Sequence, residues 1–367
     1  MATIQQLKYY INPGCPPIRT PVEGNEAFMR PEVGFNPSWF YRHCRTDFSE
    51  KWHRDVAYRL EQNLNMQQVI KNKFPGYPIG GVLEDKPPDL LTGIYGIGIM
   101  DLFFNRPLQF FNDKWPVPVG EVMDDQSLIN LKPPDLQNHP FMAHLLDQID
   151  EIQRLTGSAR GYLNWQGNLN TAFRFRGESI FTDLMDNPAL IRRLLDAIVE
   201  TYLHGVKMIY QKQEACGIHH SFATVANCTV NMVGPNIYAD VLLPYDQQIA
   251  GAFTTIGIHN CAWTVTPYLD LYKKVPRVGY IDMGIESDLV RAREIFPQAR
   301  RNCLYKSVDL KEKSREEIRK DFETIAQNLA PCDVGMPDIE YDVPEDKIMF
   351  AMDLCHELSA KFGHAEN

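Results

Sequence analysis

The residues with the most distinctive chemistry are a histidine and a cysteine separated by one position, His259 and Cys261. They follow an apolar run that predicts a short β-strand ending at this point. In extended backbone, side chains two positions apart point to the same face, so an imidazole nitrogen and a thiolate can close on one metal ion. A buried histidine beside a core thiol fits the same pattern without a metal. The pair alone leaves both interpretations open.

A third ligand would favour the metal interpretation. Cys332 lies in a segment flanked by proline and glycine, where the last strand should end, and we predict it as that ligand. Cys303 opens a predicted strand, which places it at the opposite end of the sheet. Cys228 follows a further predicted strand, and a ligand role is the less favoured interpretation for it. The predicted metal-binding and catalytic residues are therefore His259, Cys261 and Cys332.

The elements around these residues alternate between strands and helices. A helix is predicted from Pro188 to about residue 209, with Asn187 as its N-cap. Later apolar runs predict strands at residues 253–259, 278–283 and 303–308. Ser314 and Glu317 form a capping box for the helix after the last of these. This alternation indicates a parallel sheet with helical crossovers, either a barrel or an open doubly wound sheet. Because no GxGxxG turn is present, we expect an α/β fold of the (β/α)8 TIM-barrel type.

Length and composition are those of one large globular domain. The chain has 367 residues, 44% of them apolar and 23% charged, and shows no repeat or linker. We expect residues 1–75 to form an irregular extension that packs on the barrel mouth, and residues 76–367 to form the barrel. The active site is expected at the carboxyl ends of the strands, where barrels of this type place their catalytic groups.

Charge and cysteine usage restrict the partners and the compartment. The formal net charge is −10, which argues against binding to nucleic acid or to an anionic membrane. No apolar run approaches the roughly 18 residues of a membrane span, and no secretory signal is visible. Eight cysteines without a regular framework indicate reduced thiols, so we expect a cytoplasmic protein.

The second half of the chain resembles the uroporphyrinogen decarboxylase superfamily, and within it the branch of cobalamin-dependent methyltransferases. Residues 241–249 (VLLPYDQQI) are similar to a family helix, and residues 279–284 (GYIDMG) are similar to its next strand. Residues 307–310 (SVDL) depart from the Gly-Asn-x-Asp turn of the family. Methyltransferases of this branch bind zinc through a His-x-Cys pair and a distant Cys, which the resemblance assigns to His259, Cys261 and Cys332.

The N-terminal half resembles the family more loosely. Residues 28–35 (FMRPEVGF) are similar to the decarboxylase motif in which two arginines bind carboxylates, but Gly34 replaces the second arginine. Asp101 matches the central aspartate of the decarboxylases. The position of their late histidine is taken by Cys332. Losing a carboxylate clamp and gaining a thiolate ligand argues against decarboxylation.

The resemblance implies a zinc enzyme that transfers methyl groups. Zinc would polarise a small methylated substrate, best an O-methyl ether and among these an aromatic one, and a Co(I) corrinoid on a partner protein would take the methyl group. The alternatives are transfer from a methylcorrinoid to a thiol, a uroporphyrinogen-type decarboxylase, and a non-catalytic small-molecule binding barrel. A homodimer is compatible with each.

Further residues are predicted to face the substrate because they lie at strand ends or in polar and aromatic segments: Arg30, Trp39, Asp101, Asn164, Trp165, Asn227 and Asp282. For Trp39 the alternative is packing on the core. For Asp282 the alternative is a contact with His259 that orients this metal ligand without binding the metal itself.

Overall fold

The computed structural model describes residues 22, 24, 26–79 and 87–363. Six parallel strands form one curved sheet in the order β1-β8-β7-β6-β5-β4, so the first strand of the chain pairs with the last. These strands are β1 (Met29–Phe35), β4 (Phe222–Ala226), β5 (Thr255–His259), β6 (Val278–Gly284), β7 (Arg300–Leu304) and β8 (Cys332–Ile339). A separate antiparallel pair consists of β2 (Leu108–Gln109) and β3 (Val117–Pro118).

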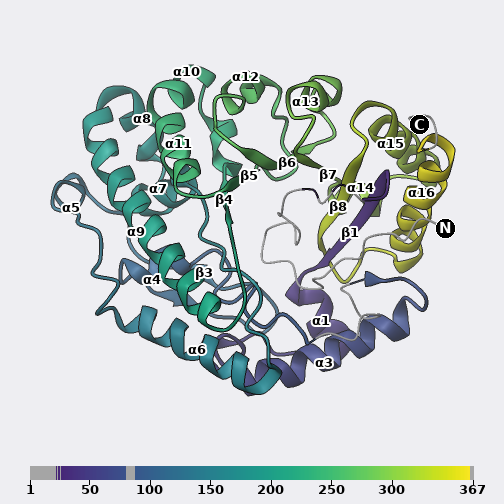
Figure 1. Ribbon diagram of the computed structural model, residues 1–367, viewed down its shortest axis with the longest axis horizontal. Helices are drawn as coiled ribbons and strands as arrows, with labels where there is room; N and C mark the ends of the chain where they lie inside the picture. Colours follow the sequence, from purple (N-terminus) through teal and green to yellow (C-terminus); the bar gives the residue numbers. More distant parts are fainter. Residues whose placement is uncertain (1–21, 23, 25, 80–86, 364–367) are drawn as a thin grey trace.

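Helices surround the strands, and the elements form a ring (Figure 1). The helices of the first half are α1 (Pro37–Cys44), α2 (Glu50–Arg54), α3 (Val56–Lys73), α4 (Ile99–Phe103), α5 (Asp125–Ile129), α6 (Pro140–Thr156), α7 (Asn168–Arg176), α8 (Ser179–Asp186) and α9 (Pro188–Ala215). Those of the second half are η2 (Cys228–Met232), α10 (Pro235–Ile237), η3 (Tyr238–Leu242), α11 (Leu243–Gly251), η4 (Thr266–Tyr268), α12 (Leu269–Tyr272), α13 (Leu289–Ile295), α14 (Ser307–Glu312), α15 (Arg315–Asn328) and α16 (Glu345–Phe362).

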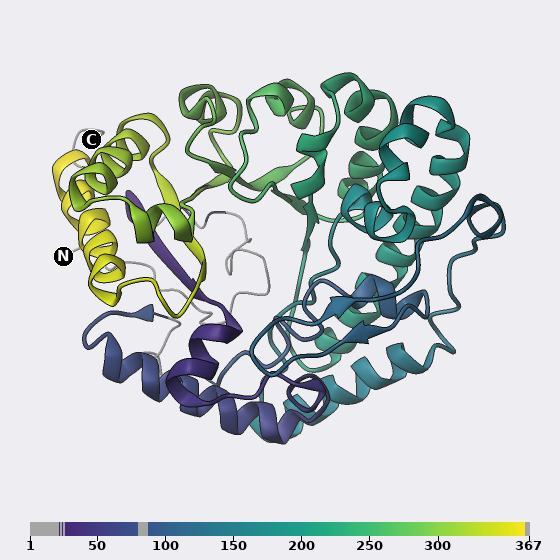
Figure 2. The same cartoon turned by 180° about the vertical axis from the view of Figure 1, so that it is seen from behind.

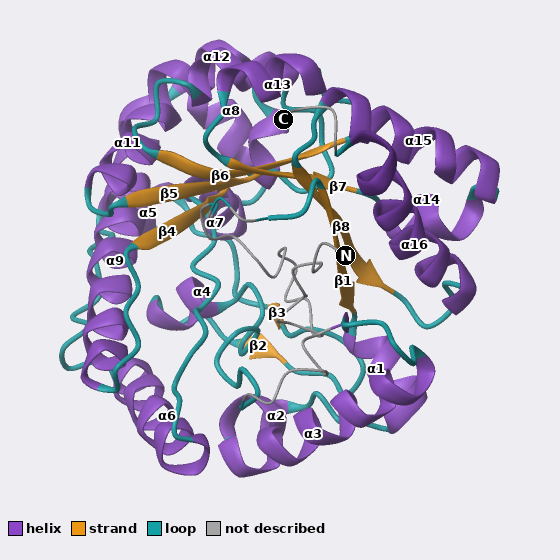
Figure 3. Ribbon diagram, turned by 45° about the vertical axis from the view of Figure 1, so that its right-hand side comes forward, coloured by secondary structure: helices purple, strands orange, loops and turns teal. Residues whose placement is uncertain are grey.

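Two segments without regular strands are residues 87–98 and 159–167. The blue loops of the first half lie across the ring from the green strands (Figure 2), and on that side only the short β2 and β3 are drawn as strands (Figure 3). The two segments are joined by a hydrogen bond from the backbone N–H of Tyr162 to Thr92 Oγ1 at 3.1 Å. The second segment ends against β4, where Gly167 lies next to the carbonyl of Ala226. The architecture is therefore an α/β barrel of the (β/α)8 type, as the sequence predicts.

Local sequence rules predict several helix boundaries correctly. Helix α9 begins after Asn187, whose side chain accepts from Leu190 N, and α15 begins with the predicted capping box of Ser314 and Glu317. Two strand predictions are wrong. Strand β7 starts at Arg300 rather than at Cys303, and Cys332 is the beginning of β8 rather than the place where the last strand ends.

The boundary expected after residue 75 does not separate an extension from the barrel. Strand β1 is a barrel strand that pairs with β8 from Met29 to Phe35, and α1 to α3 follow it as the first helical layer. Residues 29–75 thus belong to the barrel, and residues 1–21 lie outside the described part of the chain. Among the described residues, no helix has both the length and the apolar character to cross a bilayer.

Candidate metal centre

The carboxyl ends of two neighbouring strands bring the candidate ligands together. Strands β4 and β5 are paired in parallel with Ala226 opposite His259, and Asn227 N donates to the carbonyl of His259 at 2.6 Å. Cys228 comes two residues after β4, and Cys261 comes two residues after His259, the last residue of β5. Adjacent strand ends therefore carry all three residues to one edge of the barrel mouth.

The three ligand atoms of Cys228, His259 and Cys261 lie within 4.8 Å of one another. Cys261 Sγ is 2.9 Å from Cys228 Sγ and 3.2 Å from His259 Nε2. The histidine is buried, whereas both cysteines are half-buried, so the sulfur side of the cluster faces the mouth. Cys261 has φ of +58°, a left-handed conformation that turns the chain back toward the cluster.

Asp282, in β6, fixes the histidine from the opposite side. Its Oδ2 lies 2.6 Å from His259 Nδ1, and its Oδ1 accepts from Asn260 N at 2.6 Å. A carboxylate on Nδ1 keeps the proton on that nitrogen and directs Nε2 toward the sulfurs, the arrangement by which outer partners orient a metal-binding histidine. Asn260 is held in turn by Tyr272, whose hydroxyl donates to Asn260 Oδ1 at 2.6 Å.

The thiols of the chain divide into two kinds by their surroundings. The hydrogen bond from Cys261 lowers the pKa of the Cys228 thiol well below its ordinary value, and His259 and Asn170 lower it further against the opposing effect of burial. Burial instead raises the pKa of Cys332 to about 12, and it raises the pKa of Cys303 and Cys355 well above the ordinary value. Only a thiolate binds a metal ion, so the low-pKa thiol at the mouth is suited to the role and the core thiols are not.

The donor set fits zinc. Two sulfurs and one imidazole nitrogen are the ligands of catalytic zinc sites that keep a fourth position open. The Sγ–Sγ separation of 2.9 Å is shorter than the roughly 3.8 Å expected between two sulfurs around tetrahedral zinc, so the thiols need to part by less than about 1 Å to admit the ion. Side-chain rotation supplies that movement.

The structure places Cys332 away from this cluster. Cys332 is the first residue of β8 and pairs with Met29, at the amino-terminal end of the barrel and not at the carboxyl end. Strand β8 is also separated from β5 by β7 and β6, whereas β4 lies directly beside β5. The expectation that Cys332 completes the ligand set is therefore wrong in position, and Cys228 lies where the third ligand was expected.

Two of the residues predicted to bind substrate, Arg30 and Asp101, form buried ion pairs instead. Arg30 Nε lies 2.5 Å from Asp333 Oδ1, and its guanidinium also faces Glu26. Asp101 lies between two guanidinium groups, 2.8 Å from Arg174 Nε and 3.2 Å from Arg106 Nε. Because both side chains are buried and paired, the structure assigns them to the interior of the protein rather than to the barrel mouth.

Two predicted aromatic wall residues pack in the core. Trp39, in α1, is fully buried against Phe35 and Phe74, with ring centroids 4.2 and 6.2 Å away. Trp165 stacks in parallel on Phe103 at 5.6 Å and meets Tyr202 of α9 edge-on. Both rings belong to the buried apolar core, so neither is available to a substrate at the mouth.

The predicted amides lie near the cluster but bond to other side chains. Asn227 Nδ2 donates to Asp246 Oδ2 at 2.8 Å, which fixes the residue directly before Cys228. Asn164 Oδ1 accepts from Gln166 Nε2 at 2.8 Å, and Gln166 Oε1 accepts from Asn170 Nδ2 at 3.3 Å. Asn170 contacts both Cys228 and the backbone of Thr229, so this amide series reaches the candidate metal centre.

A carboxyl group at the mouth was not predicted from the sequence. Asp338 lies near the end of β8, where the register with β1 shifts by one residue and Asp338 adopts φ of +57°. Burial and Glu340 raise its pKa to about 6, with His259 and Cys228 close enough to influence the carboxyl electrostatically. The irregular register at this point is typical of a β-bulge, which can turn a side chain toward a functional site. No local sequence pattern predicts this orientation of Asp338.

Comparison with known proteins supports the fold. The sequence matches no protein-family model and no curated protein. A solved structure of a methyltransferase from Methanosarcina mazei is similar at a TM-score of 0.64 and 13% identity, covering 92% of this chain and 95% of that chain. A B12-independent methionine synthase from Shewanella sp. W3-18-1 in complex with selenomethionine aligns at a TM-score of 0.40 and 10% identity, over 91% of this chain and 98% of that chain. At 13% identity, the first match shows a shared fold.

Proposed function

We propose that this protein is a zinc-dependent methyltransferase. It takes the methyl group of a small methylated compound, best an O-methyl ether, and passes it to the Co(I) corrinoid of a partner protein. The observation that carries the proposal is the cluster of Cys228, His259 and Cys261 at the carboxyl ends of adjacent strands. The methyltransferase from Methanosarcina mazei, which has the same fold, is consistent with this chemistry.

The residues of the chain would each have a definite part in that reaction. Cys228, Cys261 and His259 would hold the ion, and a zinc ion with two thiolate ligands and one open position supplies a Lewis acid for the oxygen of the substrate. Asp282 keeps His259 in the required tautomer. Asn170 and Asp338 stand beside the sulfurs, where they would contact the substrate and exclude water from it.

Two exposed apolar side chains that follow the candidate ligands in the sequence support a protein partner. Met232 closes the 3₁₀ helix that begins with Cys228, and Trp263 comes two residues after Cys261; their side chains are 62% and 57% exposed. Large apolar side chains left in water beside an active site are typical of a docking surface. We therefore assign the corrinoid protein to the side of the mouth formed by these two loops.

The decarboxylase alternative is less well supported. A decarboxylase of this family would need Arg30 and Asp101 at the substrate, and both are held in buried ion pairs. Transfer from a methylcorrinoid to a thiol would use the same cluster and differs only in direction, so it is separated from our proposal by experiment.

Metal analysis is the first test. We expect the purified protein to hold one zinc per chain, Cys228→Ser to lose it, and Cys332→Ser to keep it as a matched control. In the second test, free Co(I) cobalamin is incubated with the protein and a panel of methyl ethers, methylamines and methyl thioethers, and the consumption of Co(I) is followed by its absorption. The proposal predicts consumption with an ether and none with Cys228→Ser. A zinc-free protein that leaves Co(I) untouched by the whole panel would overturn it, and methylcobalamin consumed by thiols would favour the reverse direction.

A further inference from the structure

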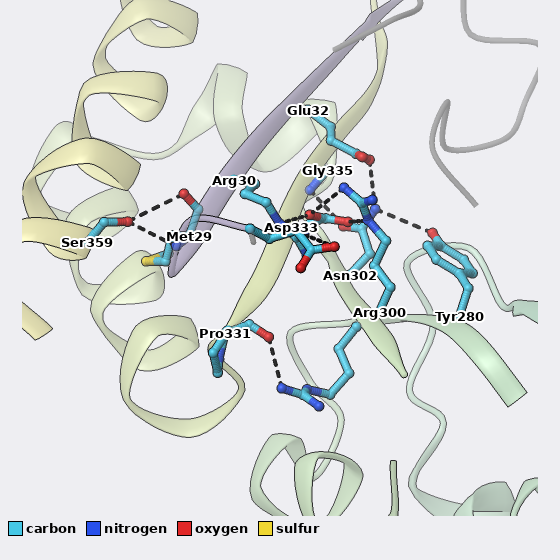
Figure 4. A network of polar contacts seen from close by, with 12 residues as sticks. Met29, Arg30, Glu32, Tyr280, Arg300, Asn302, Pro331, Asp333, Gly335 and Ser359 are labelled. Carbon is cyan, nitrogen blue, oxygen red and sulfur yellow. Dashed lines mark hydrogen bonds and ion pairs between the residues drawn. The ribbon is translucent and has the colours of Figure 1, made fainter. Parts of the chain in front are cut away.

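The interior of this barrel is polar. Side chains from β1, β6, β7 and β8 meet inside the sheet and are nearly completely buried (Figure 4): Arg30, Glu32, Tyr280, Arg300, Asn302 and Asp333. Barrels of this type usually fill the same space with layers of branched apolar side chains. Buried charges are costly unless they are paired and hydrogen-bonded, so such an interior needs a specific reason.

The lower part of this network is an ionic cluster. Asp333 lies between two guanidinium groups, with its Oδ1 2.5 Å from Arg30 Nε and its Oδ2 2.5 Å from Arg300 Nε. Burial raises the pKa of the nearby Glu32 well above its ordinary value, and Asp333 raises it further. The cluster ties β1, β7 and β8 together and holds Glu32 in place.

The middle of the network has a defined direction. Asn302 Oδ1 accepts from the backbone N–H of Gly335 at 2.9 Å. The NH₂ group of Asn302 therefore faces away from Gly335. A Cβ at residue 335 would lie 3.0 Å from that oxygen, a tight contact that glycine avoids. The amide nitrogen of Asn302 donates to Glu32 Oε2 at 2.9 Å and to the hydroxyl of Tyr280 at 3.4 Å. Because the Tyr280 oxygen accepts from Asn302, its single proton is available for another acceptor.

That acceptor is the carboxylate behind the metal ligand. Tyr280 donates to Asp282 Oδ2 at 2.9 Å, and the same oxygen lies 2.6 Å from His259 Nδ1. The hydroxyl and the imidazole therefore approach one oxygen from two sides. A carboxylate that accepts from Tyr280 cannot turn away from His259 without losing a buried hydrogen bond, which is unfavourable in the protein interior.

We propose that Tyr280, held by Asn302, is a positioning residue that sets the orientation of Asp282 and, through it, the tautomer and direction of His259. The chain of hydrogen bonds runs from Glu32 inside the barrel to the mouth and gives every donor a fixed acceptor. This inference rests on the proposed function only for the statement that His259 binds zinc.

The test is Tyr280→Phe, which removes one hydroxyl and leaves the ring. Two properties are measured, the zinc dissociation constant by competition with a chromophoric chelator and the tautomer of His259 by NMR of metal-free protein labelled with ¹⁵N-histidine. We expect the zinc affinity to fall about tenfold, the lower end of the effect of removing outer partners of a metal-binding histidine. We expect His259 to change from the Nδ1-protonated form alone to a mixture of tautomers.

The matched control is Tyr305→Phe, since the hydroxyl of Tyr305 bonds to Asp321 at 2.7 Å and does not belong to this network. A second variant, Asn302→Asp, should act in the same direction because its new carboxylate can accept the Tyr280 proton in place of Asp282. Variants that fold, bind zinc as tightly as the unchanged protein and keep one His259 tautomer would overturn the inference. The tautomer measurement needs neither zinc nor methyl transfer. A negative result would therefore contradict this inference without contradicting the proposed function.

Discussion

The sulfur atoms of Cys228 and Cys261 lie 2.9 Å apart although the two residues follow different strands. A disulfide requires about 2.05 Å, so a small movement would join them. The low pKa of Cys228 supplies the attacking thiolate. We predict that metal-free protein treated with oxidised glutathione forms an intramolecular disulfide between these two residues, detected as a cross-linked peptide pair. Zinc should prevent the reaction, and equal rates with and without zinc would show that these thiols are not ligands.

Substitution of Asp101 should affect stability rather than substrate binding. Asp101→Ala leaves the buried Arg106 and the partly buried Arg174 without their carboxylate, a change that costs about 3 kcal/mol of unfolding free energy. Urea denaturation measures this loss. The control is Asp270→Ala, whose ion pair with Arg291 is exposed and should matter by less than about 1 kcal/mol. A raised KM of Asp101→Ala with an unchanged unfolding free energy would show instead that Asp101 contacts the substrate.

The stability of the protein should depend on pH through His53. This buried imidazole accepts a hydrogen bond from Tyr95 N at 2.9 Å, and burial, with a contribution from Arg59, lowers its pKa to about 3. The unfolded chain protonates His53 near pH 6.5, so it binds more protons than the folded protein below that pH. The unfolding free energy therefore falls as the pH drops from about 6.5 to about 3, by on the order of 5 kcal/mol from this residue.

His53→Asn tests this dependence because its side-chain oxygen can accept from Tyr95 N but does not titrate. Urea denaturation at a series of pH values should give a shallower fall for the variant than for the unchanged protein. Parallel curves would mean that His53 is not responsible.

A methyl group at Gly167 should disturb the metal centre through the backbone. A Cβ there would lie 1.9 Å from the carbonyl oxygen of Ala226, two residues before Cys228. Gly167→Ala should lower the unfolding free energy by about 3 kcal/mol or more and weaken zinc binding. At Gly251 nothing lies within 4 Å of an added Cβ, so Gly251→Ala should be neutral or slightly stabilising. Equal effects of the two changes would contradict the close packing of Gly167.

The proposed docking surface predicts a selective effect of Trp263. Trp263→Ala should slow methyl transfer to a protein-bound corrinoid at least tenfold, since an exposed tryptophan at an interface commonly contributes more than about 2 kcal/mol to binding. Transfer to free cobalamin should not change. Leu64→Ala, at another exposed apolar residue in α3, serves as the control. A Trp263→Ala defect with free cobalamin as well would place the residue at the substrate instead.

The sequence predicts those features that depend on neighbouring residues. The N-cap at Asn187 and the capping box at Ser314 satisfy backbone donors within one turn, so the local pattern is sufficient. The pair His259 and Cys261 is equally local, since both follow one strand. The choice of a third ligand is different, because it depends on which strand ends are neighbours in the ring. Cys228 and Cys332 both lie at strand ends, and only the pairing of β4 with β5 decides between them.

The buried charges are the second feature that local reasoning misses. Arg30 and Asp101 have the residue types of a carboxylate-binding or catalytic site, because arginine and aspartate are rarely fully buried. Their partners, Asp333 and Arg174, are far away in the chain and become visible only in the folded structure. Strand boundaries fail for a related reason: with polar side chains facing the interior, β7 and β8 lack the apolar run by which a buried parallel strand is usually recognised.

The pairing of β1 with β8 also has a consequence for how the chain is made. Within the described residues, β1 pairs with no other strand, and Met29 is held by Cys332 and by Ser359 of α16. During synthesis, the hydrogen bonds between β1 and β8 can therefore form only after nearly the whole polypeptide has left the ribosome. In nascent chains that stop short of residue 332, the backbone N–H and C=O groups of β1 would lack the strand with which they pair, and an unpaired strand edge of this kind favours pairing with other chains.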